Sequence, residues 1–135
     1  MRIISGEAKG RALFAPPGSD TRPTSDKIRG SLFNIIASRV MDARVLDLFG
    51  GTGALALEAL SRGAESAVIV DSSRQAWQVI ERNARSVLKD DFEYRARILC
   101  ADYRSAIAAL EGSLFDLVFL DPPYRMVEAY GEEGR

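Results

Sequence analysis

The stretch Asp47-Leu48-Phe49-Gly50-Gly51-Thr52-Gly53 decides the fold, because it joins a short apolar strand to a helix through a glycine turn. We expect the strand over Val45–Phe49 and the helix over Ala54–Arg62, where Gly63 ends it. Glycine allows a tight turn to bring the backbone against a ligand without a Cβ in the way. The free N–H groups at the start of the helix suit an anion such as a carboxylate.

The same rhythm of strand and helix continues along the chain. Strands are predicted over Ala67–Val70, Arg97–Cys100 and Phe115–Leu120. Helices are predicted after Ser73, which can cap one, and over Tyr103–Leu110. Such alternation requires right-handed crossovers and a mostly parallel sheet with helices on both faces. The predicted fold class is therefore α/β and Rossmann-like.

The first 40 residues follow a different pattern. Arg2–Ser5 and Arg11–Ala15 predict a small β-hairpin, and a helix capped at Thr24 or Ser25 is predicted to run to about Arg39. Four apolar residues at helical spacing predict the buried face of that helix: Ile28, Leu32, Ile35 and Ile36. We expect residues 1–40 to be a substrate-side extension and residues 41–135 to be the ligand-binding and catalytic domain.

Composition narrows the function classes. The chain is 47% hydrophobic and 27% charged, has no histidine, and has one cysteine, Cys100. These counts exclude an internal disulfide, a histidine general base and a histidine metal site, so we expect no metal. No apolar run reaches the roughly 18 residues of a membrane span, and the N-terminus lacks the apolar core of a signal peptide. We therefore expect a cytoplasmic protein with no membrane partner.

Charge is unevenly distributed. Residues 1–44 hold 8 Lys and Arg against 4 Asp and Glu, whereas residues 45–135 hold 10 against 15. A polyanion such as a nucleic acid would therefore meet the N-terminal segment more favourably than the rest of the chain.

Each predicted strand carries an acid at or near its carboxyl end: Asp47, Asp71, Asp102 and Asp121. In open parallel sheets, ligands bind beyond these carboxyl ends. Asp71 lies 20 residues beyond Gly51, which is the spacing at which a second-strand acid accepts hydrogen bonds from ribose hydroxyls.

Two cofactor classes fit the glycine turn. The segment 51–56 has the Gly-x-Gly-x-x-Ala form typical of nicotinamide dinucleotide sites. A dinucleotide brings a pyrophosphate, which the charge of Asp47 would repel, whereas S-adenosylmethionine has no phosphate and carries a sulfonium and an ammonium. The turn therefore favours S-adenosylmethionine, and a dehydrogenase remains the alternative.

The turn Asp121-Pro122-Pro123-Tyr124 suits an exocyclic amine on a nucleic-acid base. The two prolines stop the strand and stiffen the turn. The Asp121 carboxylate and the Pro122 carbonyl can each accept one hydrogen of the amine, which aims its lone pair at a methyl donor. Tyr124 offers a flat face on which an extruded base can stack. Such a reaction needs positioning rather than a nucleophilic residue.

Together these segments resemble the RsmD family of bacterial methyltransferases, which act on guanine N2 of small-subunit (16S) ribosomal RNA. The resemblance extends over about residues 1–124 and rests on five segments: Met1–Arg11, Thr21–Asn34, Asp47–Gly53, Ala59–Ala64 and Asp121–Tyr124. It implies a class I methyltransferase fold, S-adenosyl-L-methionine as cofactor, and ribosomal RNA or an assembling small ribosomal subunit as partner.

The resemblance also implies residue roles. The cofactor-binding residues would be Asp47, Gly51 and Gly53 for the methionine part, Asp71 for the ribose, and Asp102 with Tyr103 for the adenine, and Phe49 would also contact the cofactor. The catalytic residues would be Asp121, Pro122, Pro123 and Tyr124. The residues facing RNA phosphate would be Lys9, Arg11, Arg22 and Arg29.

The chain ends about ten residues after the Asp-Pro-Pro-Tyr turn, where the family continues with further strands. We therefore expect a truncated form whose last strand has an exposed apolar edge, monomeric if complete and otherwise able to dimerise through that edge. Two further alternatives remain open: an adenine-N6 methyltransferase acting on DNA or RNA, and an inactive module that binds cofactor or RNA.

Overall fold

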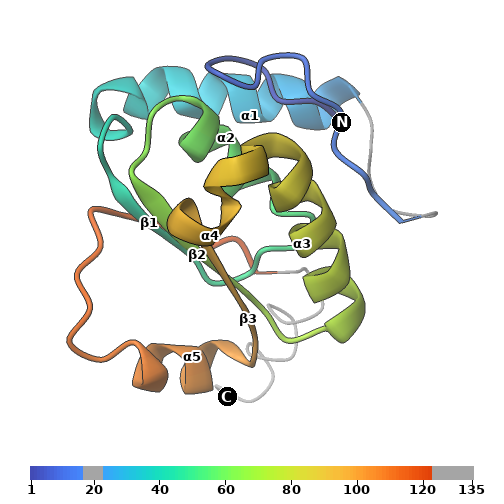
Figure 1. Cartoon of the computed structure of the whole chain (residues 1–135). Coiled ribbons are helices and arrows are strands. Elements are labelled where there is room, and N and C mark those ends of the chain that lie inside the picture. Colours follow the sequence, from blue (N-terminus) through green and yellow to red (C-terminus); the bar gives the residue numbers. More distant parts are fainter. Residues whose placement is uncertain (17–22, 123–135) are drawn as a thin grey trace, which may run out of the picture.

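A computed structural model describes residues 1–16 and 23–122, excluding the side chains of residues 23–25 (Figure 1). The four strands are β1 (Arg44–Asp47), β2 (Ser66–Asp71), β3 (Ala96–Cys100) and β4 (Leu117–Phe119). The helices are α1 (Pro23–Ile36), α2 (Ala54–Ser61), α3 (Arg74–Leu88), α4 (Phe92–Arg95) and α5 (Tyr103–Ala109), with 3-10 turns at Ala37–Arg39 and Lys89–Asp91. The strands form one parallel sheet in the order β3-β2-β1-β4, which confirms the predicted α/β fold.

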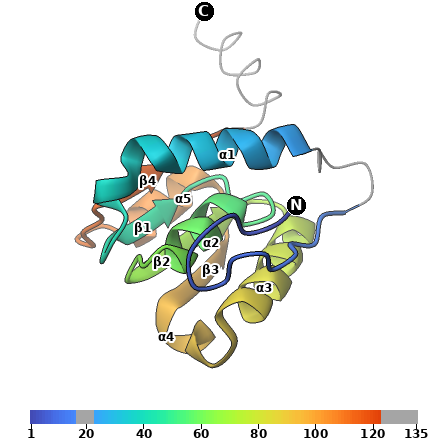
Figure 2. The ribbon, with the colours of Figure 1, turned by 90° about the horizontal axis from the view of Figure 1, so that it is seen from above.

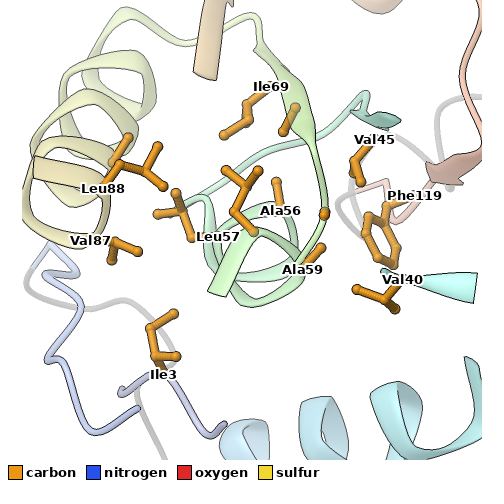
Figure 3. Close-up of a cluster of buried hydrophobic side chains, with 14 of the residues drawn as sticks. Ile3, Val40, Val45, Ala56, Leu57, Ala59, Ile69, Val87, Leu88 and Phe119 are labelled. Carbon is orange, nitrogen blue, oxygen red and sulfur yellow. The ribbon is translucent and has the colours of Figure 1, made fainter. Parts of the chain in front are cut away.

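Helices cover both faces of the sheet, with α1 and α5 on opposite sides (Figure 1). The larger core lies between the sheet and the helices α1, α2 and α3, and Figure 3 shows part of it. A smaller core lies between the sheet and α5. The consecutive residues Ile69 and Val70 of β2 are both fully buried, one in each core. Burial on both faces explains why the strands are continuous apolar runs rather than alternating ones.

Most of the predicted elements are present, with small shifts in their bounds. Ser73 caps α3 as predicted, since its side chain accepts a hydrogen bond from the Ala76 N–H at 3.2 Å. Strand β4 is shorter than predicted, and the one-turn helix α4 was not predicted. Among the described residues, no helix combines the length and apolar character needed to cross a bilayer.

The predicted N-terminal hairpin is reduced to a single antiparallel bridge between Arg2 and Ala12. Its backbone hydrogen bonds are nevertheless those of two paired segments: Leu13 N–H donates to Met1 O at 2.8 Å and Ile3 N–H donates to Arg11 O at 2.9 Å. Figure 2 shows this N-terminal segment lying over α2 and beside α3.

The predicted buried face of α1 is wrong in part. Ile28 and Ile35 are 64% and 82% exposed, whereas Phe33 is fully buried and Arg29 is 4% exposed. The helix is rotated in this way because the Phe33 ring packs 5.8 Å from the Phe119 ring while Arg29 forms ion pairs beneath the helix. These contacts turn inward the face of α1 that carries Phe33 and Arg29.

Strand β4 lies at one end of the sheet as described. It pairs with β1 on one side, and within residues 1–16 and 23–122 it has no strand on the other. Val118 and Leu120 on this strand and just after it are 51% and 65% exposed. The exposed apolar edge predicted for the last strand is therefore present in the described part of the chain.

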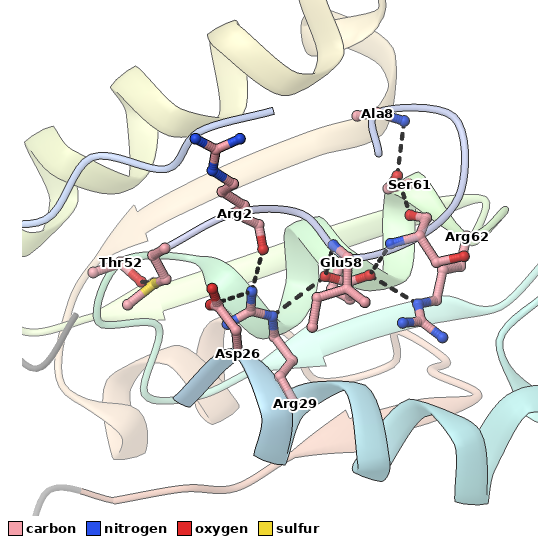
Figure 4. A network of polar contacts seen from close by, with 11 residues as sticks. Arg2, Ala8, Asp26, Arg29, Thr52, Glu58, Ser61 and Arg62 are labelled. Atoms are coloured by element: carbon pink, nitrogen blue, oxygen red, sulfur yellow. Dashed lines mark hydrogen bonds and ion pairs between the residues drawn. The ribbon is translucent and has the colours of Figure 1, made fainter. Parts of the chain in front are cut away.

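Glu58 of α2 is a fully buried carboxylate that holds three parts of the chain together (Figure 4). Its two oxygens accept the N–H groups of Ile4 and Ser5 at 2.9 and 3.1 Å. They also accept the guanidinium Nε of Arg29 at 3.3 Å and of Arg62 at 2.8 Å. Arg29 in turn donates to the carbonyl of Arg2, so one acid anchors the N-terminal segment and α1 to α2.

We predict that Glu58→Gln destabilises the protein by about 3 kcal/mol, because an amide leaves buried guanidinium charge without its carboxylate. The matched control is Glu81→Gln, which breaks an ion pair with Arg85 of the same i, i+4 spacing on the outside of α3. That exposed pair contributes less than about 0.5 kcal/mol. Urea denaturation measures both, and equal losses for the two variants would contradict the structural role of Glu58.

Candidate functional site

The carboxyl ends of β1, β2 and β4 meet at one edge of the sheet, as parallel pairing requires. Asp47 ends β1 and lies in register with Ile69 of β2 and Phe119 of β4. Asp71 ends β2, and Asp121 follows β4 by two residues. The charges of Asp121 and Asp71 both act on the carboxyl of Asp47. The glycine turn and the start of the Asp-Pro-Pro-Tyr turn therefore border the same region of the surface.

The glycine turn lies against the end of β2. Gly50 N–H donates to Val70 O at 2.7 Å, and a Cβ on Gly50 would lie only 2.7 Å from Ile69 Cγ2. Gly51 has a φ of +62°, and a Cβ there would meet nothing within 4 Å. Gly53 precedes α2 with a φ of +84°. The turn thus presses against the sheet at Gly50 and leaves an open backbone face at Gly51.

Asp71 links this turn to the end of β2. Its Oδ2 accepts the Gly51 N–H at 2.9 Å, and its Oδ1 accepts the Ser73 N–H at 2.9 Å. Each carboxylate oxygen has a further lone pair, so the group can still accept hydrogen bonds from a ligand hydroxyl. The two backbone donors fix the direction in which it does so.

Asp47 is the least satisfied polar group of the site. It is 1% exposed, its Oδ1 accepts the Phe49 N–H at 3.2 Å, and its Oδ2 has no hydrogen-bond partner within the described part of the chain. Burial raises the pKa of Asp47 to about 7, against the opposing effect of the Phe49 N–H. The neighbouring charges of Asp121 and Asp71 contribute to this raised pKa, less than burial does. A buried carboxylate with a free oxygen is well suited to a cationic ligand group.

Two aromatic rings, one from the glycine turn and one from the start of α5, lie against each other. The rings of Phe49 and Tyr103 are 5.6 Å apart and tilted by 45°. Asp102 precedes Tyr103 and caps α5, accepting the Ser105 N–H at 2.8 Å. That backbone hydrogen bond is the main cause of the lowered pKa of Asp102. Asp102 therefore has a structural role that does not depend on any ligand.

A mostly apolar cleft of about 440 Å³ opens beside Asp121. Residues of three elements form its walls: Ile28 and Leu32 of α1, Ala54 and Leu55 of α2, and Val118 and Phe119 of β4. Met1, Arg29, Leu120 and Asp121 complete the lining. Pro122 follows Asp121 in the chain, whereas the predicted catalytic residues Pro123 and Tyr124 lie outside the described residues.

The predicted RNA-facing residues are dispersed. Lys9 is exposed, and Arg11 lines a different hollow, with Leu88 and Lys89 at the end of α3. Arg22 lies outside the described residues. Arg29 was expected to approach RNA phosphate, and this expectation is wrong: the side chain is buried and bound by Glu58 and Asp26.

The structural roles of two buried polar residues, Glu58 and Asn83, were not predicted from the sequence, although Asn83 falls on the predicted inward face of its helix. Asn83 of α3 is 1% exposed and connects two distant segments. Its Nδ2 donates to Thr52 O at 2.9 Å and to Phe14 O at 3.0 Å, and its Oδ1 accepts the Phe14 N–H at 2.8 Å. The available signal was a polar residue among the apolar residues of each helix, which is the expected position of a buried hydrogen-bonding group.

Comparison with known proteins shows the family of the chain. Residues 1–133 match the family described as Conserved hypothetical protein 95. The chain belongs to this family. It is 42% identical to YlbH of Bacillus subtilis over 127 residues. That alignment covers 93% of this chain and 67% of YlbH. It is 38% identical to ribosomal RNA small subunit methyltransferase D of Escherichia coli K12 over 125 residues. That alignment covers 93% of this chain and 61% of the relative. The resemblance to the RsmD family is thereby confirmed.

Solved structures give the same result for the fold. The structure of Escherichia coli YhhF aligns with a TM-score of 0.79 at 39% identity, over 93% of this chain and 65% of that one. A methyltransferase from Agrobacterium tumefaciens, described as SAM-dependent, aligns with a TM-score of 0.60 at 30% identity. The alignment covers 76% of this chain and 33% of that one. The predicted Rossmann-like methyltransferase fold is confirmed. The chain spans about three fifths to two thirds of the length of the curated relatives named above.

The raised pKa of Asp47 predicts a specific dependence of stability on pH. In the unfolded chain, Asp47 loses its proton near pH 4, whereas in the folded protein it does so near pH 7. Its contribution to the free energy of unfolding therefore falls as the pH rises from about 4 to about 7 and is constant above that. Between pH 5 and pH 8, the wild type should lose about 2 kcal/mol relative to Asp47→Asn in urea denaturation.

Asp116→Asn is the control for this measurement. The Asp116 carboxylate is exposed, and hydrogen bonds from Arg44 lower its pKa, so it stays ionised from pH 5 to pH 8. The difference between wild type and this variant should be constant over that range. A constant difference for Asp47→Asn as well would show that burial does not hold the proton on Asp47.

Proposed function

We propose that the protein is an S-adenosylmethionine-dependent methyltransferase acting on the exocyclic N2 amine of a guanine in small-subunit (16S) ribosomal RNA. The observation that carries this proposal is the unsatisfied, buried carboxylate of Asp47 between the glycine turn and Asp121. A cation would fit beside the Asp47 carboxylate at the glycine turn, and a planar amine would fit beside Asp121.

The residues present fit this cofactor. The free Oδ2 of Asp47 would accept the ammonium or lie beside the sulfonium, and a pyrophosphate would be repelled there. Asp71, held by two backbone N–H groups, would accept the ribose hydroxyls. Phe49 and Tyr103 would enclose the adenine ring with apolar surface. When bound, S-adenosylmethionine supplies an electrophilic methyl group.

The chain itself would position the acceptor. The Asp121 carboxylate would accept one hydrogen of the guanine amine and the Pro122 carbonyl the other, which orients the lone pair of the nitrogen. The apolar cleft beside Asp121 would receive the extruded base and exclude water from it. The proton released by the amine after transfer would pass to the Asp121 carboxylate or to solvent. Positioning of this kind accounts for catalysis without histidine or metal.

The substrate assignment rests on family membership and charge. The relative from Escherichia coli is named for small-subunit ribosomal RNA, and residues 1–44 of this chain carry the excess of Lys and Arg. Ribosomal RNA as substrate would place the protein in the cytoplasm, with RNA or an assembling small subunit as its partner. The further strands of the longer relatives would pair with the free edge of β4, and a second copy of the chain is the alternative partner for that edge.

Cofactor binding should depend on pH through Asp47. Below pH 7 the cation must displace a proton from Asp47, so S-adenosylmethionine should bind up to tenfold more weakly for each pH unit. Calorimetry at pH 6 in two buffers of different ionisation enthalpy should detect close to one proton released, and none at pH 8. Asp47→Asn should abolish the release. Binding of NAD in preference to S-adenosylmethionine would refute the cofactor assignment and favour a dehydrogenase.

Methyl transfer should depend on Asp121. At pH 8, transfer to unmodified small-subunit RNA should fall roughly hundredfold in Asp121→Ala, because the amine loses one of its two acceptors. S-adenosylmethionine affinity should be unchanged, and Glu81→Gln is the control variant. Transfer only to adenine in DNA or RNA would favour an adenine-N6 enzyme. Cofactor binding without any transfer would indicate an inactive binding module.

A further inference from the structure

A groove of about 300 Å³ separates the N-terminal segment from α3, on the side of α3 away from the sheet. It is lined by Phe14, Pro16, Gln75, Gln78, Val79 and Arg82. We propose that this groove binds an unpaired nucleobase of the RNA that flanks the methylated nucleotide. The inference rests on the proposed function for its RNA, but concerns residues that the proposed cofactor and acceptor sites do not use.

The lining has the chemistry that single-stranded RNA requires. The Phe14 ring is 40% exposed, and the guanidinium carbon of Arg82 lies 4.1 Å from the ring centroid. Single-stranded bases stack on aromatic rings and on guanidinium planes, and this stack presents both. The exposed amides of Gln75 and Gln78 each have donors and an acceptor for the edges of a base.

The charge of the groove favours a nucleotide. Arg82 is exposed, and none of the six lining residues is acidic. The neighbouring Glu81 on α3 is neutralised by an ion pair with Arg85. The phosphate of a bound nucleotide would therefore meet a positive rather than a negative field.

A chain of contacts links the groove to the acceptor cleft. Asn83 joins the backbone of Phe14 to Thr52 of the glycine turn through hydrogen bonds of 2.8 to 3.0 Å. On its other side, Thr52 Oγ1 lies 3.6 Å from the Sδ of Met1, which lines the acceptor cleft. Thr52 therefore connects the walls of the two hollows, and one RNA strand could place nucleotides in both.

The groove is organised before any ligand binds. The backbone of Phe14 is fixed by an Asn83 side chain that is 1% exposed, and the apolar base of the groove is Val79, which is 7% exposed. A stacking residue on a fixed backbone loses little conformational freedom on binding, which favours affinity. An incidental surface contact would lack such support.

The test measures binding of a fluorescent single-stranded oligoribonucleotide to the full chain at fixed ionic strength. Phe14→Leu and Arg82→Gln should each weaken binding about tenfold or more, whereas Phe14→Trp should bind as wild type because it keeps the stacking face. Arg97→Gln is the control, since it removes the same charge from an exposed position on β3, outside the groove. Calorimetry should show unchanged S-adenosylmethionine affinity in all four variants.

A second measurement guards against indirect effects. Photo-crosslinking of an oligonucleotide that contains 5-iodouridine should label the peptide that carries Phe14. Equal weakening by Arg82→Gln and Arg97→Gln, with no effect of Phe14→Leu, would overturn the inference and leave only general charge attraction. Wild-type RNA affinity in every variant would overturn it in favour of a protein segment as the occupant.

Methyl transfer is assayed separately, so that the two proposals can fail independently. RNA binding that depends on Phe14 but is followed by no transfer counts against the methyltransferase proposal and supports the groove. Transfer to RNA that is unaffected by Phe14→Leu, in both KM and kcat, counts against the groove alone.

Discussion

The arrangement of the molecule depends on one buried carboxylate, Glu58, which receives hydrogen bonds from two backbone N–H groups and two guanidinium groups. A buried charge is tolerated only when such partners compensate for the loss of water. Through these partners, the N-terminal segment and α1 are fixed over α2, and Met1 reaches the cleft beside Asp121. Asp47 is the second deeply buried acid. Unlike Glu58, it has one oxygen without a hydrogen-bond partner among the described residues. One acid is satisfied by the protein, and the other remains available to a ligand.

The sheet could be predicted because its signals are local. Each strand is an apolar run between a glycine or acid and a helix, and parallel order follows from the alternation. The grouping of Asp47, Asp71 and Asp121 at one edge then follows from topology alone, since all three come at or just after the carboxyl ends of strands. The roles of these residues toward a cofactor and a base do not follow from topology, and they stand as proposals.

The rest could not be predicted because it depends on contacts distant in sequence. Arg29 and Ile28 are neighbours in α1, and periodicity favoured Ile28 for the interior. The partner that draws Arg29 inward is Glu58, which lies 29 residues away. The phase of α1 was therefore decided by an ion pair that no helical periodicity can reveal. The same applies to the clamp formed by Asn83, whose partners Phe14 and Thr52 lie 69 and 31 residues away.

That clamp limits which substitutions position 83 can tolerate. Both hydrogens of the amide point at backbone carbonyls, and its oxygen receives a backbone N–H. Leucine has a similar size but would leave all three backbone groups without partners. Aspartate, the product of spontaneous deamidation, would set a negative charge against two carbonyl dipoles. Chemical ageing at this single position would therefore release the glycine turn and the N-terminal segment together.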